Sequence, residues 1–227
     1  MRKNKQKLFL FSLITLVSLF IVGCSTGGTT TVTKEAQETS KGALETIKEA
    51  GKIRIAVFGD KAPFGYIDEN GKNQGYDVYL ARRIAKDLLG SEEAIEFVIV
   101  EAKNRVDVLK ANKVDLVLAN FTVTDERKEQ VDFANPYMKV AIGVASPKAS
   151  LVTTPEELVG EKLIINKGTT AETYFASKYP EIEQEKYDQN TEAFEALKDG
   201  RGAALAHDNT LLYAWVKDNP SFEVSIK

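Results

Sequence analysis

The sequence predicts an α/β protein built from two similar halves, each a sheet flanked by helices. Apolar segments of strand length alternate with amphipathic helical segments from about residue 44 to residue 217, and this alternation is typical of βαβ units with parallel strands. The alternation starts again after residue 140, so we expect two lobes. A weak internal similarity supports this, because LKANK at 109–113 and LKDGR at 197–201 each precede a predicted strand.

The first half begins with a short helix that ends at a glycine, Gly51. Segment 77–88 is the clearest amphipathic helix, because its apolar residues recur on one face. The expected strands are 53–58, 95–100 and 115–119, and the expected helices are 44–50, 77–88 and 104–112.

The second half has a strong helix start at 154–157 (TPEE), with an N-cap threonine, a proline at the first helical position and an acid at the third. Its expected strands are 140–146, 162–166 and 203–207, and its other expected helices are 171–178, 191–198 and 209–217. Three strands make a thin sheet, and residues 225–227 end the chain inside a strand pattern. We therefore expect a C-terminal segment to be missing.

The N-terminus has the pattern of an export signal. Four basic residues precede an apolar run at 8–22, which is short for a membrane span of roughly 20 residues. The sequence IVGC at 21–24 then predicts a lipobox with Cys24 as the lipidation site; the alternative is an ordinary signal peptide with an incidental cysteine. Cys24 is the sole cysteine, so no disulfide can form within the chain.

These features predict the domain boundaries. Residues 1–23 form the lipoprotein signal peptide, 24–43 a flexible linker, 44–143 the first lobe and 144–227 the second. The linker is rich in Thr, Ser and Gly and lacks apolar periodicity. We expect a protein of the cell envelope, lipid-anchored to a membrane and facing the periplasm or the cell exterior.

Composition excludes several classes of function. The formal net charge is −3, and removal of residues 1–23 takes away four basic and no acidic residues, which leaves −7. This charge argues against a nucleic-acid binder. His207 is the single histidine, so a metal site would need carboxylates alone as its other ligands. We expect neither a metal nor a cofactor.

In each half, a polar residue lies near the end of the predicted strand that follows the repeated segment. Eleven residues beyond the leucine that opens each repeat lie Asn120 and Asp208, both near the carboxyl end of a predicted strand. In open parallel sheets this edge is where ligands bind. Two lobes that face each other across such edges would form a hinged clamp.

The segment TVTDER at 122–127 places Arg127 in the first turn of a predicted helix, where a cation opposes the helix dipole. One explanation is a surface ion pair with a nearby acid. The other is that Arg127 makes a bidentate interaction with a ligand carboxylate, with Thr122 and free helix N–H groups completing the anion site.

Three other segments have both a structural and a functional interpretation. KGTT at 167–170 could bind a ligand through glycine and hydroxyl groups, or simply cap a helix after a tight turn. Asp208 could accept hydrogen bonds from an ammonium group, or cap the helix that follows. PFGY at 63–66 could line a cleft or pack its own loop.

Taken together, the motifs resemble the bacterial extracellular solute-binding proteins that receive polar amino acids. The resemblance extends from about residue 44 to the end of the chain and is closest to cysteine-binding receptors through GDK at 59–61, ANFT at 119–122 and segment 202–211. The other matching stretches are QGYD at 74–77, VDFANPY at 131–137, NKGTT at 166–170 and HD at 207–208.

This resemblance implies a two-lobed fold of the type II periplasmic-binding-protein kind, each lobe a mixed sheet flanked by helices, with the C-terminal return to lobe 1 absent. It implies that Arg127 holds the α-carboxylate of an amino acid with Thr122 and Thr170, and that Asp208 holds the α-ammonium beside Asn120. Lys61 replaces an aromatic residue of related receptors, which suits a small or acidic side chain. The remaining candidate ligand-binding residues are Phe121, Gly168, Thr169 and His207.

The expected function is therefore capture of free L-cysteine, or of a similar small polar amino acid, for an ABC permease. One alternative is an enzyme on the same fold, a small dehydratase acting on a cyclic carboxylate, with His207 or Asp208 as its acid or base. The other is a sensory or adhesive lipoprotein that uses the same clamp to signal.

Overall fold

The structure, a computed structural model, describes residues 41–226. The predicted signal peptide at 1–23, the lipidation site Cys24 and nearly all of the predicted linker lie outside the described residues and stay predictions. Among residues 41–226, no helix has the length and apolar character needed to cross a bilayer.

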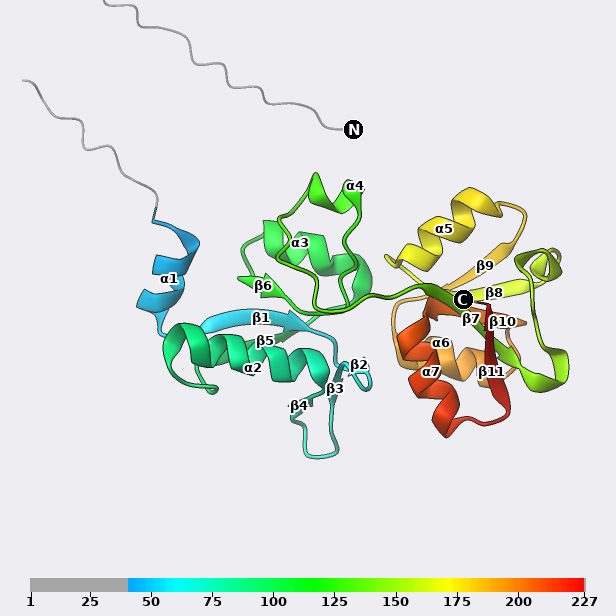
Figure 1. Ribbon diagram of the computed structural model, residues 1–227, viewed down its shortest axis with the longest axis horizontal. Helices are drawn as coiled ribbons and strands as arrows, with labels where there is room; N and C mark the ends of the chain where they lie inside the picture. The colour runs from blue at the N-terminus through cyan, green and yellow to red at the C-terminus, as the bar shows by residue number, and fades with distance from the viewer. Residues whose placement is uncertain (1–40, 227) are drawn as a thin grey trace, which may run out of the picture. The chain divides into compact units, whose positions relative to one another are not determined.

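The first half contains a three-stranded parallel sheet in the order β5-β1-β6 (Figure 1). The central strand, β1, pairs Ile55 with Phe97 on one side and with Leu116 on the other. The strands are β1 (Ile53–Val57), β5 (Ile95–Ile99) and β6 (Leu116–Val117), and the helices are α1 (Ala43–Ala50), α2 (Tyr76–Leu89), α3 (Arg105–Lys110) and α4 (Asp125–Lys128), with a 3₁₀ turn η1 (Ala102–Asn104).

Alternate residues of β1 point to two different apolar clusters, as the period of a strand requires. Ile53 and Ile55 pack with the apolar face of α2, whereas Ala56 belongs to a cluster that includes residues of α3. The sheet is thus covered on both faces, as parallel sheets are. The third strand is shorter than predicted, because the chain leaves the sheet after Val117 and turns through Asn120, which has a φ of 42°.

A small antiparallel sheet follows β1 and was not predicted. It comprises β2 (Asp60–Lys61), β3 (Gly65–Ile67) and β4 (Asn73–Gln74). Phe64, in the turn between β2 and β3, is buried in the same apolar cluster as Phe194 and Leu211 of the second half. This loop therefore packs through its aromatic residue, and it carries Lys61 toward the second half.

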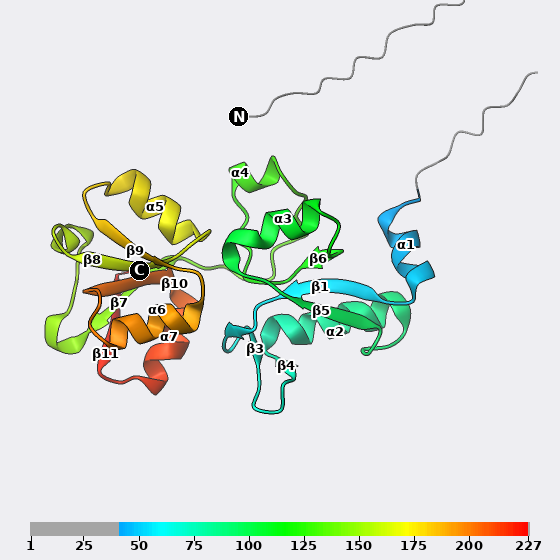
Figure 2. The same ribbon diagram turned by 180° about the vertical axis from the view of Figure 1, so that it is seen from behind.

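The second half contains a five-stranded mixed sheet in the order β11-β7-β10-β8-β9 (Figure 2). Strands β10, β8 and β9 run parallel, while β7 is antiparallel to both of its neighbours. The strands are β7 (Ile142–Pro147), β8 (Lys162–Asn166), β9 (Glu183–Tyr187), β10 (Ala204–Asp208) and β11 (Phe222–Ile226), and the helices are α5 (Thr170–Lys178), α6 (Asn190–Lys198) and α7 (Asn209–Asp218), with 3₁₀ turns η2 (Lys148–Ser150) and η3 (Pro155–Leu158).

The α/β class with helix-flanked sheets is confirmed, with three local corrections. The expectation of only three strands in the second half was wrong, because β9 and β11 extend the sheet at its two edges. The TPEE segment forms only a single 3₁₀ turn, not the predicted start of an α-helix. The Thr154 side chain makes no capping hydrogen bond there. Gly160, with a φ of 87°, lies in the short link between that turn and β8. A mixed sheet was expected in each lobe, but only the five-stranded sheet of the second half is mixed. The described strands β5, β1 and β6 of the first half pair only in parallel.

Candidate ligand-binding site

A small cavity is lined by polar residues of both halves of the protein. Its volume is about 10 Å³, which is the space of a single water molecule. A molecule as large as a free amino acid can enter only after the surrounding groups move apart. The lining residues are Lys61, Arg105, Asn120, Thr122, Arg127, Thr169, Thr170, His207 and Asp208.

Eight of the ten predicted ligand-binding residues line this cavity. Phe121 and Gly168 do not; both contact the Arg127 guanidinium instead. Asn120 and Asp208, which the repeat paired in the sequence, line the same cavity.

The Arg127 guanidinium is held by backbone carbonyl groups. It donates to Thr122 O at 2.7 Å and to Gly168 O at 3.0 Å, and it lies 4.7 Å from the centre of the Phe121 ring. No ion pair joins it to an acid among the described residues, so the surface-pair explanation was wrong. The unfavourable interaction of Arg127 with the helix dipole is also small, because α4 is only four residues long.

Arg105 was missed by the sequence analysis, although it lines the cavity. Its buried guanidinium donates to four backbone carbonyl oxygens at 2.8–2.9 Å, those of Ala102, Ala119, Asn120 and Gly168. Burial, together with the nearby Arg127 charge, lowers the pKa of Arg105 to about 9, so the group is still charged at pH 7. In the sequence it is one more cation at the start of a short helix, which does not distinguish it from a surface residue.

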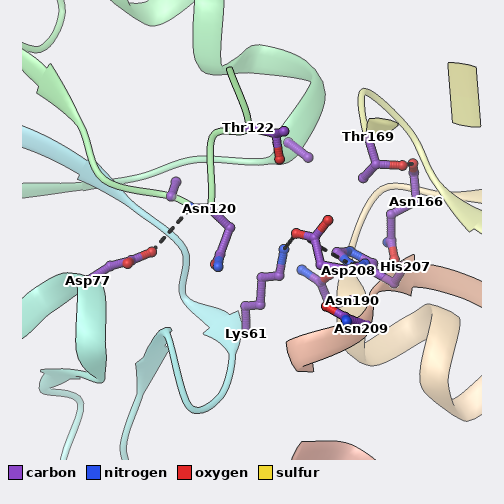
Figure 3. Close-up of polar contacts among 12 residues, drawn as sticks. Lys61, Asp77, Asn120, Thr122, Asn166, Thr169, Asn190, His207, Asp208 and Asn209 are labelled. Atoms are coloured by element: carbon purple, nitrogen blue, oxygen red, sulfur yellow. Dashed lines mark hydrogen bonds and ion pairs between the residues drawn. The ribbon is translucent and has the colours of Figure 1, made fainter. Parts of the chain in front are cut away.

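Asp208 is the last residue of β10 and is almost fully buried. It does not cap α7, because no side-chain cap bond forms there. Its Oδ2 lies 3.9 Å from Lys61 Nζ and its backbone N–H donates to His207 Nδ1 at 2.7 Å (Figure 3). The carboxylate is thus left free to face the cavity.

His207 is buried and neutral. Burial, with the Lys61 and Arg105 charges, holds its pKa well below the usual value. Since Nδ1 accepts the Asp208 N–H, the proton sits on Nε2, which is buried and has no hydrogen-bond partner among the described residues. The 4.0 Å approach of His207 to Asp208 is therefore not an ion pair.

Lys61 is 2% exposed, which is rare for a lysine. Its Nζ lies 4.7 Å from the centre of the Phe58 ring. Burial lowers the pKa of Lys61 to about 8, and the Asp208 charge partly opposes this. The amine therefore stays largely protonated at pH 7.

The two threonines that follow Gly168 differ in function. Thr169 caps α5, because its Oγ1 accepts from Glu172 N at 3.3 Å and donates to Asn166 O at 2.7 Å. The helix-cap interpretation of this segment thus holds for Thr169. Thr170, at the first position of α5, and Thr122 present their side chains at the cavity.

Asn120 has a strained backbone and an unpaired side chain. Its φ of 42° is uncommon for a residue other than glycine, and its backbone N–H donates to Asp77 Oδ2 at 3.2 Å. Asp77 is fully buried, which raises its pKa to about 6, and it also accepts from the Tyr137 hydroxyl at 2.8 Å. Asn120 Oδ1 is buried without a partner among the described residues, so it offers an acceptor to a ligand.

Several contacts join the two halves around the cavity. Asp60 accepts from Asn190 at the start of α6, from the backbone N at 2.6 Å and from Nδ2 at 3.0 Å. Asp188 forms two ion pairs: its Oδ1 lies 2.7 Å from Lys103 Nζ, and its Oδ2 lies 3.1 Å from Lys167 Nζ. These contacts, with the tiny cavity, describe a closed arrangement.

No group of three or more His, Cys, Asp or Glu side chains that could hold a metal ion occurs within residues 41–226. The groups that line the cavity are two guanidinium groups, an ammonium group, a carboxylate, an amide, an imidazole and threonine hydroxyl groups. This combination suits a small molecule that carries both an anion and a cation.

Comparisons with known proteins agree with this geometry. Residues 53–219 match the bacterial extracellular solute-binding proteins, family 3. An ABC transporter glutamine-binding protein of Bacillus subtilis (strain 168) is 32% identical over 225 residues, which are 98% of this chain and 82% of that protein.

Two solved structures are more similar in sequence. A solute receptor for L-cysteine from Neisseria gonorrhoeae is 61% identical, with a TM-score of 0.80 over 81% of this chain and 74% of that one. A cysteine-binding protein from Campylobacter jejuni is 62% identical, with a TM-score of 0.80 over 82% and 75%. The chain therefore belongs to the bacterial extracellular solute-binding proteins, family 3.

Proposed function

We propose that this protein captures a free α-amino acid, with L-cysteine preferred, and delivers it to an ABC importer. The observation that carries the proposal is that the Arg127 guanidinium and the Asp208 carboxylate line one small cavity. Their charges match the α-carboxylate and the α-ammonium that every free amino acid carries.

Arg127 has hydrogen-bonding capacity to spare for a carboxylate. A guanidinium has five N–H donors, and Arg127 uses one toward Thr122 O and one toward Gly168 O. The remaining donors, with the hydroxyl groups of Thr122 and Thr170, would bind the α-carboxylate. Asp208, assisted by the unpaired Oδ1 of Asn120, would accept from the α-ammonium.

The preference for cysteine rests on size and on relatives. The cavity is polar and small even for cysteine, so a longer side chain such as that of glutamine or arginine would require a larger separation of the two halves. The two receptors that are 61% and 62% identical are both named for cysteine.

Closure over the ligand would provide the signal to a permease. A ligand that binds the closed state better shifts the protein toward it, and contacts such as Asp60 with Asn190 exist only when the two halves meet. The B. subtilis relative is named as part of an ABC transporter, which supports a permease as the partner. We further infer that a diacylglyceryl group on Cys24 anchors the receptor, because two acyl chains hold a protein on a membrane stably.

The site gives little support to an enzyme. A general acid or base must exchange a proton, but His207 is buried, and its pKa is held well below the usual value. Its Nδ1 is already occupied by the Asp208 N–H. A receptor role without catalysis is therefore part of the proposal. Loss of amino-acid uptake on gene deletion would separate transport from a sensory or adhesive role.

Calorimetric titration of the purified protein with each of the twenty amino acids and with cystine, under reducing conditions except for cystine, tests the proposal. We expect cysteine to bind tightest, with a Kd of about 1 μM or lower, equivalent to at least ~8 kcal/mol. Tighter binding of another amino acid would keep the receptor role but overturn the assignment of cysteine. Absence of binding to all of them would overturn the proposal.

Replacing Asp60 with alanine is expected to weaken cysteine binding by about 5- to 30-fold, because a helix-capping carboxylate contributes ~1–2 kcal/mol. This contact joins the two halves, so its loss penalises the closed state alone. Asp199→Ala is the matched control, since Asp199 pairs with Arg201 of the same half. Equal affinities of the two variants in calorimetry would contradict a role for Asp60 in closure.

A further inference from the structure

Lys61 carries a positive charge that an α-amino-acid clamp does not need. The ligand's α-carboxylate and α-ammonium would be met by Arg127 and Asp208. The nearest carboxylate to Lys61 is Asp208, with 3.9 Å between Nζ and Oδ2. With a ligand bound, two ammonium groups would share this one carboxylate, so Lys61 would be short of an anionic partner.

The other charged groups around Lys61 do not fill that role. Asp77 and Asp60 raise the pKa of Lys61 less than Asp208 does. Both are engaged elsewhere, Asp77 by Tyr137 and Asn120, and Asp60 by Asn190. Arg105 repels Lys61, His207 is neutral and Arg127 is itself a cation.

The hydrogen bonds of Lys61 are also incomplete. An ammonium group has three N–H donors, yet Nζ makes no hydrogen bond within residues 41–226 and rests over the Phe58 ring. Lys61 lines the cavity, so an acceptor on a ligand could satisfy these donors. Figure 3 shows the Lys61 side chain reaching toward the Asp208 carboxylate, with the Asn120 side chain nearby. A ligand side chain placed here would therefore be an acceptor and, by preference, an anion.

We propose that this receptor binds cysteine as its thiolate, with the sulfur against the Lys61 ammonium. This inference rests on the proposed function and adds the ionisation state of the ligand. On binding, the S–H bond breaks, the electron pair stays on sulfur and the proton passes to solvent. Lys61 keeps its own proton. Discrimination from serine follows, since a serine hydroxyl does not ionise near neutral pH.

The proposal gives the pH dependence a definite sign. Below about pH 7 the free thiol, with a pKa of about 8.5, holds its proton, so binding releases one and the affinity rises about tenfold per pH unit. Lys61, with a pKa lowered to about 8, is already charged there. Above both values the free amine is neutral and must regain a proton, so the affinity falls. The optimum lies near pH 8.

Two measurements on the unmodified protein test this directly. Calorimetry at pH 7 in buffers of different ionisation enthalpy is expected to show nearly one proton released per cysteine bound. Difference absorption spectroscopy is expected to show the ultraviolet band of a thiolate in the complex. Cysteine binding with neither proton release nor thiolate band would overturn the inference and leave the proposed function intact. Failure of cysteine to bind would overturn the proposed function itself.

Variants of Lys61 identify the group responsible. Lys61→Met is expected to weaken cysteine binding by about 10- to 100-fold, as loss of a charge-assisted hydrogen bond does, and to abolish the proton release and the thiolate band. Lys61→Arg keeps the charge and is expected to retain both. Lys52→Met removes an exposed lysine that pairs with Glu96 and is expected to change nothing. Retention of the thiolate band in Lys61→Met would overturn the role of Lys61.

Discussion

Replacing Asp208 with asparagine is expected to weaken amino-acid binding by about 30-fold to several thousand-fold. Removing one partner of a buried charge pair costs about 2–5 kcal/mol, and within residues 41–226 Asp208 is the one carboxylate that lines the cavity. The α-ammonium of the ligand would lose its anionic partner, and the amide that replaces the carboxylate would present donors as well as an acceptor. The loss should appear in calorimetry for every amino acid that the wild-type protein binds.

The same substitution has a second expected effect, on Lys61. The Asp208 charge raises the pKa of Lys61, while burial lowers it to a net value of about 8. Without that charge the pKa of Lys61 should fall further, toward neutral pH. A shift of the pH optimum of binding to lower values would report it.

A matched control lies at the other end of α7. Asp218 is the last residue of that helix and is exposed, so Asp218→Asn changes the same functional group at the surface. Thermal unfolding of both variants would show whether each is folded. An Asp208→Asn protein that is folded and binds cysteine with wild-type affinity would contradict the assignment of Asp208 to the α-ammonium.

The regular elements that the sequence predicted share a strong apolar pattern. Helix α2 is an example, because it buries one well-defined face, and strand β1 is another, because it is apolar at nearly every position and packs on both faces. Strand β9 has the sequence EQEKY and is exposed or half-buried throughout, so it carries no such pattern. It exists because β8 offers it a parallel partner edge, a tertiary fact that local sequence does not contain.

The site residues also fall into those that the sequence predicted and those that depend on contacts distant in the chain. Asn120 and Asp208 could be predicted from their repeated place beyond two strands, and both line the cavity. Arg105 could not, because its role depends on carbonyl groups as distant in the chain as that of Gly168. The burial of Lys61 likewise results from the small β2-β3-β4 sheet and the second half of the chain, which no local pattern revealed.

Replacing Gly168 with alanine is expected to weaken ligand binding by on the order of 100-fold, the result of overpacking a site that cannot relax. A Cβ there would lie 2.4 Å from Lys103 Cα and 2.6 Å from Lys103 N. Those are backbone atoms of the other half of the protein, so the two halves must separate. Gly168 does not line the cavity, and the loss would therefore come from blocked closure rather than from a lost ligand contact.

Gly200→Ala separates this effect from backbone strain. Gly168 and Gly200 have similar left-handed φ angles, 74° and 70°, but a Cβ on Gly200 would meet nothing within 4 Å. Both variants are expected to lose about 1 kcal/mol of stability from strain, while only Gly168→Ala loses affinity. Small-angle scattering should show ligand-induced compaction in the wild type and in Gly200→Ala. Compaction of Gly168→Ala at wild-type ligand concentrations would mean that the contact between Gly168 and Lys103 does not control closure.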